Sequence, residues 1–191
     1  MSLLLSGLIK ERKKIMSDAE IIAFYSPYTG AGKTTMAKIL DDNWSIILSF
    51  ADPLYRYAEY LQPELSRKED KGKTFEEFGG KTLREFLIHF GQAGREFYPN
   101  IWSEVMRKNI YKLKDTFNII IDDLRFPNEY AMLREEGAKI VRITNPGREI
   151  IKTETEALLE GYTFDYELVN YKRSIEEYKA QFDEMMRKLW P

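Results

Sequence analysis

The strongest constraint on the fold is an alternation of apolar runs with helical patterns. Runs that predict buried strands lie at residues 20–25, 44–50, 117–122, 138–143 and 166–170. Apolar residues at helical spacing follow these runs over 33–41, 53–61, 81–94, 100–114, 128–136 and 174–189. Buried strands separated by helices predict a parallel sheet covered by helices on both faces. We therefore expect an α/β fold that binds ligands at the carboxyl ends of its strands.

The composition narrows the class of protein and of partner. The chain has 191 residues, enough for one domain with a buried core. Its 29 basic and 31 acidic residues nearly cancel, which argues against a nucleic-acid polymer or a membrane surface as partner. The absence of cysteine excludes disulfides and thiolate metal sites and fits a reducing cytoplasm. A homodimer is compatible with the sequence.

The first residues do not read as a membrane or export signal. The apolar stretch at residues 1–9 is too short to span a bilayer, and the basic residues come after it, the reverse of a signal peptide. We expect residues 1–15 to be an N-terminal extension and residues 16–191 to form a single domain.

The segment FYSPYTGAGKTT, at residues 24–35, predicts a phosphate-binding loop. It follows a predicted buried strand and leads directly into a helix, so backbone N–H groups and the helix dipole can hold an anion. Pro27 stands where the first glycine of the motif is expected. That glycine mainly permits the turn out of the strand, and Gly30 supplies the backbone flexibility that the proline removes. The residues expected around the phosphates are Gly30, Ala31, Gly32, Lys33, Thr34 and Thr35.

The chemistry of such a loop assigns two side chains. Lys33 is expected against the β- and γ-phosphates of ATP, and Thr34 is expected to bind Mg²⁺. The tripeptide Gly-Lys-Thr recurs at 72–74 and 80–82, but neither copy follows a strand. We interpret those copies as solvated loop or helix-start residues.

A second informative run is IIIDDLRFPNE, at residues 119–129. It brings Asp122 and Asp123 to the carboxyl end of a buried strand, where a carboxylate can hold Mg²⁺ or orient an acceptor. A capping or turn aspartate is the alternative for either residue, and the sequence does not choose between the two. Arg125 follows at once, and a basic group beside a carboxylate pair suits phosphate binding.

Three segments together resemble a known family. SFADPLY (49–55), TLREFLIHFGQAGREFYPNIW (82–102) and DDLRFPNE (122–129) resemble, in order and spacing, the deoxynucleoside monophosphate kinases of bacteriophages and bacteria. The resemblance extends over about residues 20–182. It implies a three-layer P-loop kinase fold with five parallel strands, ATP and Mg²⁺ as cofactors, and transfer of the γ-phosphoryl group to a deoxynucleoside 5′-monophosphate. A phage-encoded member would work in the host cytoplasm.

Arginines are the expected acceptor ligands, because phosphoryl transfer needs two anions held in line and a guanidinium offers a planar fork to phosphate. Together with the resemblance, this assigns Arg84, Arg95 and Arg125 to the acceptor phosphate and, with Lys33 and Asp123, to the catalytic set. Arg84 and Arg95 are eleven residues apart, so one helix can show both on nearly the same face. Exposed arginines in surface ion pairs are the alternative.

Two further residues are assigned to the acceptor. By resemblance, Asp52 lies near the acceptor's sugar or phosphate, whereas a helix N-cap before Pro53 is the alternative. Phe90 or Tyr98 is a candidate for stacking on the acceptor base, although core packing is the favoured interpretation for any single aromatic residue. Both belong to an acceptor-binding region expected at about 52–115.

Two polar stretches predict segments outside the sheet. The charged, glycine-containing stretch at 63–80 predicts a mobile excursion. The stretch at about 144–161 predicts a lid that excludes water from ATP, with Arg148 contacting the cofactor.

Two other readings of the sequence stay open. One is a different small-molecule P-loop kinase, of the phosphomevalonate or dephospho-coenzyme A type. The other is a nucleotide-binding regulatory module without catalysis, although the Asn-Lys-x-Asp motif of guanine-nucleotide switches is absent from the sequence.

Overall fold

The centre of the molecule is a parallel sheet. The computed structural model describes residues 20–28, 30–41, 44–145, 158–171 and 174–190. Five strands lie in the order β2-β5-β1-β6-β7, and every pairing is parallel. Their bounds are β1 Ile21–Tyr25, β2 Ser45–Leu48, β5 Asn118–Leu124, β6 Lys139–Thr144 and β7 Tyr166–Val169. All five residues of β1 are buried, as expected for a central parallel strand.

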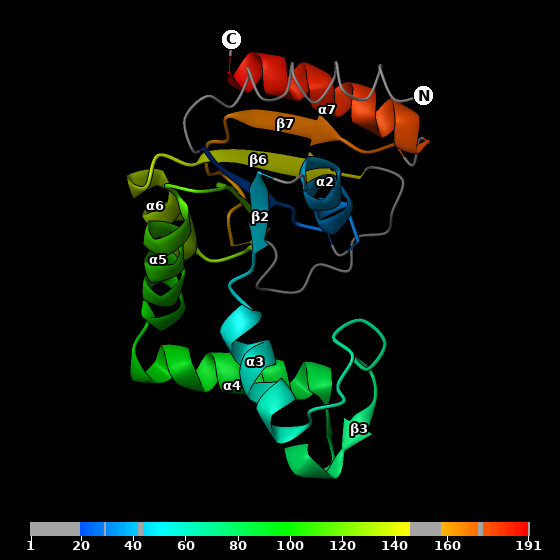
Figure 1. The fold of residues 1–191 in the computed structure, drawn as a ribbon, viewed down its shortest axis with the longest axis vertical. Helices are drawn as coiled ribbons and strands as arrows, with labels where there is room; N and C mark the ends of the chain where they lie inside the picture. The colour runs from blue at the N-terminus through cyan, green and yellow to red at the C-terminus, as the bar shows by residue number, and fades with distance from the viewer. Residues whose placement is uncertain (1–19, 29, 42–43, 146–157, 172–173, 191) are drawn as a thin grey trace.

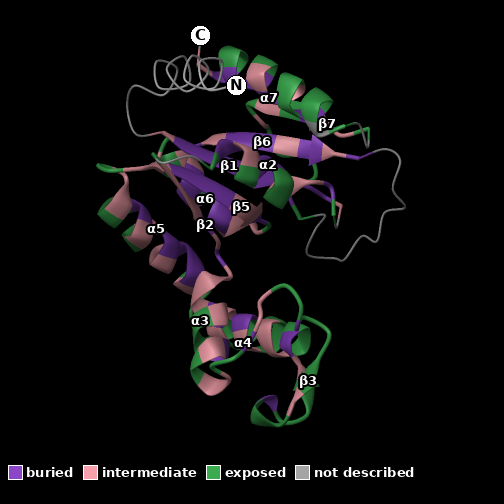
Figure 2. Cartoon of the chain, turned by 45° about the vertical axis from the view of Figure 1, so that its right-hand side comes forward, coloured by how far each residue is buried: buried purple, intermediate pink, exposed green. Residues whose placement is uncertain are grey.

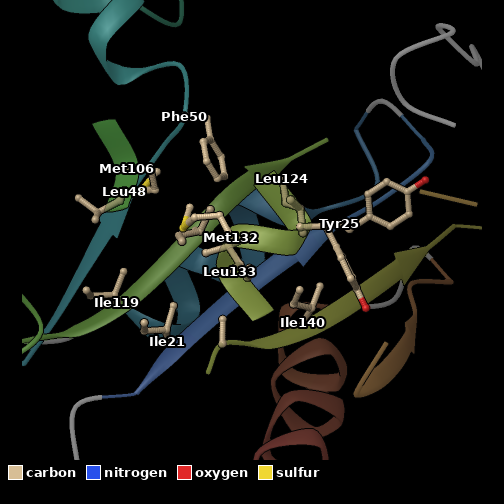
Figure 3. Close-up of a cluster of buried hydrophobic side chains, with 14 of the residues drawn as sticks. Ile21, Tyr25, Leu48, Phe50, Met106, Ile119, Leu124, Met132, Leu133 and Ile140 are labelled. Atoms are coloured by element: carbon tan, nitrogen blue, oxygen red, sulfur yellow. The ribbon is translucent and has the colours of Figure 1, made fainter. Parts of the chain in front are cut away.

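Helices cover both faces of this sheet (Figure 1). These are α2 Lys33–Leu40, α5 Ile101–Leu113, α6 Pro127–Glu135 and α7 Ile175–Leu189, while α3 Asp52–Leu61 and α4 Leu83–Phe97 lie away from the sheet. Side chains of α2 and α7 pack with Ile22 and Phe24 of β1 in one core cluster. Side chains of α5 and α6 pack with Ile21 and Tyr25 of the same strand in another cluster, shown in Figure 3. Because successive strand residues point to opposite faces, one apolar strand supplies both cores.

The predicted α/β class is confirmed: the structure is a three-layer fold with a five-stranded parallel sheet and helices on both faces. Most predicted elements lie within a few residues of their expected bounds. A capping box opens α7: the Ser174 hydroxyl accepts from Glu177 N, and the Glu177 carboxylate accepts from Ser174 N. Across the described ranges, none of the helices combines the length and apolarity needed to cross a bilayer.

A smaller helical unit extends away from the sheet (Figures 1 and 2). It contains α3, α4 and a two-stranded hairpin of β3 (Thr74–Phe75) and β4 (Lys81–Thr82). Its core includes Leu65 and Phe78, which pack with Ala58 and Leu83. The stretch predicted to be a mobile excursion is therefore anchored by its own apolar side chains.

The helical unit also accounts for the two other Gly-Lys-Thr copies. Gly72 and Lys73 of the first copy are exposed and lie outside any helix or strand, as expected, and Thr74 pairs with Thr82 in the hairpin. Thr82 of the second copy is the N-cap of α4, as a helix-start residue should be, and its hydroxyl accepts from Glu85 N at 3.2 Å.

Candidate functional site

The loop between β1 and α2 has the backbone that the sequence predicted. Gly30 and Gly32 adopt φ values of 72° and 106°, which favour glycine. A Cβ atom at Gly32 would lie 2.8 Å from Asn170 Nδ2 and 3.0 Å from Tyr178 Oη, so a larger residue would have to displace these side chains as well as adopt a strained φ. Asn170 also donates to the carbonyl of Ala31 at 2.9 Å, which ties the loop to the end of β7.

The proline in this loop is accommodated by a local turn. The buried Ser26 hydroxyl accepts from the backbone N–H of Tyr28 at 3.1 Å, across the proline. Helix α2 then begins at Lys33, and the structure shows no side-chain cap at its start. A helix start of this kind suits an anion, because its first N–H groups and the positive end of the helix dipole face the loop.

Thr34 and Asp122 meet at this helix start. The Thr34 hydroxyl donates to Asp122 Oδ2 at 3.0 Å, which joins the loop to the end of β5. Burial, followed by the charge of Asp123, raises the pKa of Asp122 to about 6, while the Thr34 hydrogen bond and the Lys33 charge oppose the rise. A cation beside this carboxylate would favour its charged form.

A divalent ion fits this pair of oxygen donors. Mg²⁺ is usually bound through one or two protein oxygens plus substrate phosphates and water. In the described part of the chain, no group of three or more His, Cys, Asp or Glu side chains could hold a metal by itself. Thr34 and Asp122 are therefore suited to an ion that arrives with a phosphate.

Asp123 faces the other way and anchors a turn. Its carboxylate accepts from Phe50 N at 2.8 Å, from Ala51 N at 3.0 Å and from the Ser49 hydroxyl. These three donors connect β2 to α3 and occupy both carboxylate oxygens. The geometry thus favours Asp122 over Asp123 as the ligand of an ion, and gives Asp123 a structural role that competes with the predicted catalytic and metal roles.

Arg95 is brought to the sheet by the packing of α4 on α5. Trp102 Nε1 donates to the carbonyl of Gly91 at 2.9 Å, and a Cβ atom at Gly94 would lie 2.5 Å from Trp102 Cζ2. Glycine at position 94 therefore permits the close approach of the indole. The Arg95 guanidinium lies over the Phe126 ring, 3.8 Å from its centroid.

Burial and a neighbouring charge both act on Arg95. Burial lowers the pKa of its guanidinium, the Glu129 carboxylate opposes this, and the charge of Arg125 adds to the lowering. Glu129 links the two arginine positions, because its Oε1 lies 3.6 Å from Arg95 Nη2 and its Oε2 accepts from the backbone N–H of Arg125. The structure brings Arg95 and Arg125 to one region, at the carboxyl end of β5.

Glu129 is the site residue that the sequence interpretation missed. The residue is 2% exposed, and its Oε2 accepts from Arg125 N and Phe126 N, each at 3.0 Å. Burial and the charge of Asp123 raise the pKa of Glu129 to about 7. The signal was the order Pro-Asn-Glu at a helix start, which puts a glutamate at the third helical position, where it can bond the preceding N–H groups.

The other predicted acceptor residues are placed less directly. Arg84 lies on the same helix as Arg95, as expected, but it is exposed in the first turn of that helix. At 1.5 Å per residue, the two arginines are about 16 Å apart along the helix axis. Phe90 packs among Tyr57, Phe86 and Trp102, so core packing is the arrangement observed.

Asp52 is not the N-cap of its helix, because α3 begins at Asp52 and Ala51 precedes it as the N-cap. Its carboxylate accepts from Ser49 N at 3.1 Å and from Arg67 Nη1 at 2.8 Å. Arg148 and most of the predicted lid lie outside the described residues.

The fold and the loop together define a three-layer α/β protein with a glycine-bearing loop between β1 and the start of α2. No family model matches the chain. A curated protein of Acanthamoeba polyphaga mimivirus, named "Putative deoxynucleotide monophosphate kinase", is 29% identical over 177 residues, which cover 80% of this chain and 89% of that protein. Among solved structures, an unliganded sugar kinase from Janibacter sp. HTCC2649 matches at a TM-score of 0.43 and 15% identity, over 89% of this chain and 98% of that one.

Proposed function

We propose that the chain is an ATP- and Mg²⁺-dependent kinase that transfers the γ-phosphoryl group to a deoxynucleoside 5′-monophosphate. The observation that carries the proposal is the 3.0 Å hydrogen bond from Thr34 to Asp122, because it joins a loop hydroxyl and a strand-end carboxylate at the start of α2. A nucleoside triphosphate with its ion needs these two groups together. The name of the mimivirus relative supports a deoxynucleotide acceptor, without pointing to a phage or bacterial type.

The donor side of the proposed reaction uses the loop. Backbone N–H groups at Gly30–Thr35 and the Lys33 ammonium would hold the β- and γ-phosphates at the start of α2. Thr34 and Asp122 would hold Mg²⁺, which when bound neutralises charge on the phosphate oxygens.

The acceptor side uses the opposite wall of the site. Arg95 and Arg125 would hold the acceptor's phosphate at the carboxyl end of β5, opposite the loop. Asp123 fixes the turn into α3, and Asp52, through Arg67, ties that helix to the hairpin region. In-line transfer would then follow from the positions of two held anions.

A coupled assay of ADP release tests this proposal. The panel contains the four common deoxynucleoside monophosphates, phosphomevalonate and dephospho-coenzyme A, each with ATP and Mg²⁺. Turnover is expected with at least one deoxynucleotide. Turnover with phosphomevalonate or dephospho-coenzyme A alone would favour the other small-molecule kinases, and saturable ATP binding without any turnover would favour a regulatory module.

Lys33→Ala is the matched variant for the donor side. We expect it to lose at least about 100-fold in turnover, because a charged contact to the transferring phosphates is removed, while the circular dichroism spectrum stays unchanged. Lys38→Ala, in the exposed last turn of the same helix, is the control and should retain activity. Near-normal kinetics in a folded Lys33→Ala protein would refute the role of the loop.

A further inference from the structure

The burial of Glu129 is larger than its capping role requires. Two other glutamates, Glu85 of α4 and Glu177 of α7, occupy the same third helical position and accept from the backbone of their N-cap residues. Both are exposed, whereas Glu129 is 2% exposed. A buried carboxylate is costly unless it is paired, so capping alone does not explain the placement of Glu129.

The two carboxylate oxygens of Glu129 have different partners. Oε2 accepts both capping hydrogen bonds, from Arg125 N and Phe126 N. Oε1 lies 3.6 Å from Arg95 Nη2. In the described part of the chain, no other carboxylate lies within ion-pair distance of Arg95. One carboxylate oxygen thus caps the start of α6, and the other is the ion-pair partner of Arg95.

Arg95 is held on two sides and stays accessible. The Phe126 ring lies under the guanidinium, Glu129 lies beside it, and 22% of the Arg95 side chain is exposed. Asn128, one residue before Glu129, donates to the carbonyl of Pro99 at 2.8 Å and so ties the same segment to the end of α4. The segment 126–129 therefore fixes both the guanidinium and the end of the helix that carries it.

We infer that Glu129 is a positioning residue, which holds the Arg95 guanidinium ready for the phosphate of the acceptor. The inference rests on the proposed function, because it assigns to Arg95 the acceptor's phosphate. Without the carboxylate, a half-buried guanidinium loses its counter-charge and turns towards water, and the orientation that matches a phosphate is lost. Glu129 itself touches no substrate in this assignment.

Glu129→Gln isolates this role, since glutamine keeps an oxygen for the capping bonds and removes the charge. We expect kcat/KM for the deoxynucleotide acceptor to fall about 10-fold or more, which corresponds to about 1.4 kcal/mol, while the KM for ATP changes less than about twofold. Glu177→Gln is the matched control, because it makes the same change at the same helical position of α7, away from any arginine of the site. It should leave both constants unchanged.

A double-mutant cycle separates positioning from general structure. In an Arg95→Ala background, Glu129→Gln should have no further effect on kcat/KM, because the group through which Glu129 acts is gone. Equal losses for ATP and acceptor, an additive effect in that background, or acceptor kinetics like those of the wild type would each overturn the inference. If Glu129→Gln melts below the assay temperature, Glu129→Asp, which keeps the charge but shortens the side chain, should raise the acceptor KM alone.

Failure of the proposed function would look different. A wild-type protein with no turnover on any deoxynucleotide would remove both proposals together. An active wild type with an unaffected Glu129→Gln variant would remove only the role of Glu129.

Discussion

Replacing Asp122 by asparagine is expected to stabilise the ligand-free protein at neutral pH while it abolishes turnover. The pKa of Asp122 is raised from 3.8 to about 6, mainly by burial. A folded-state pKa above the unfolded value means that ionisation opposes folding. Below about pH 4 the carboxyl is protonated in both states and costs nothing. Between about pH 4 and 6 the unfolded chain loses its proton first, and above about pH 6 the cost is constant.

The size of the effect follows from this shift. Two pKa units at about 1.4 kcal/mol each give an upper bound of about 3 kcal/mol. The side chain is only partly buried, and solvent screening reduces the expected gain to about 1–2 kcal/mol. Asparagine keeps an oxygen for the Thr34 hydroxyl, so that hydrogen bond need not be lost. For a chain of this size, the gain corresponds to a rise in Tm of roughly 2–8 °C.

The neighbouring aspartate provides the control. Asp123→Asn makes the same change in charge, but Oδ2 of Asp123 accepts from two donors and Oδ1 from a third, and an amide cannot accept all of them. We expect a loss of about 1–3 kcal/mol in the free energy of unfolding. Two adjacent isosteric substitutions should therefore shift stability in opposite directions.

Urea unfolding of the wild type and both variants, at about pH 8 and about pH 4, measures these effects. The advantage of Asp122→Asn should be present at the higher pH and absent at the lower one. MgATP should raise the Tm of the wild type and not that of Asp122→Asn. A destabilised Asp122→Asn protein at about pH 8, or a gain that persists unchanged in acid, would refute the account of this carboxylate.

Two further substitutions test the packing around the site. Gly94→Ala places a Cβ atom 2.5 Å from Trp102 Cζ2. The overpacking should cost about 1–3 kcal/mol, more than the roughly 1 kcal/mol that alanine gains in helix propensity. A variant that is more stable in urea unfolding would contradict the observed packing. Tyr178→Phe removes a buried hydroxyl that has no hydrogen-bond partner among the described residues. The free energy of unfolding should therefore stay equal or rise by up to about 1 kcal/mol. A clear drop in Tm would show that the hydroxyl has a partner.

The sheet could be predicted from the sequence because a strand that is buried on both faces appears as a continuous run of apolar residues. The strand at 21–25 is apolar at every position, and such a short run followed by a glycine-bearing loop is typical of a buried parallel strand. The segment at 63–80, which contains the first strand of the hairpin, has no such apolar run. Its apolar anchors, Leu65 and Phe78, are isolated among charged residues, and they are buried only by contacts with α3 and α4 that lie elsewhere in the sequence.

The sequence suggested most residues of the candidate site, Glu129 excepted, but it did not suggest what each of them contacts. The alternation along β5 requires Asp122 and Asp123 to point to opposite sides, but it does not say what lies on each side. That depends on α2 bringing Thr34 to one carboxylate and on the turn before α3 bringing backbone N–H groups to the other. Arg84 and Arg95 share one helix as predicted, yet only Arg95 lies where α5 and α6 pack against that helix.

Three carboxylates share the carboxyl end of β5, and each meets the start of a different helix. Asp123 accepts from the N–H groups before α3, Glu129 from those before α6, and Asp122 from the Thr34 hydroxyl of α2. Helix starts carry partial positive charge, which makes this concentration of negative charge tolerable. The difference lies in the donors: backbone N–H groups hold Asp123 and Glu129 in place, whereas a side-chain hydroxyl can rotate to share an ion with its carboxylate. In the proposed reaction, Asp122 is therefore the one of the three that would exchange its hydrogen bond for Mg²⁺, and the other two would shape the acceptor side.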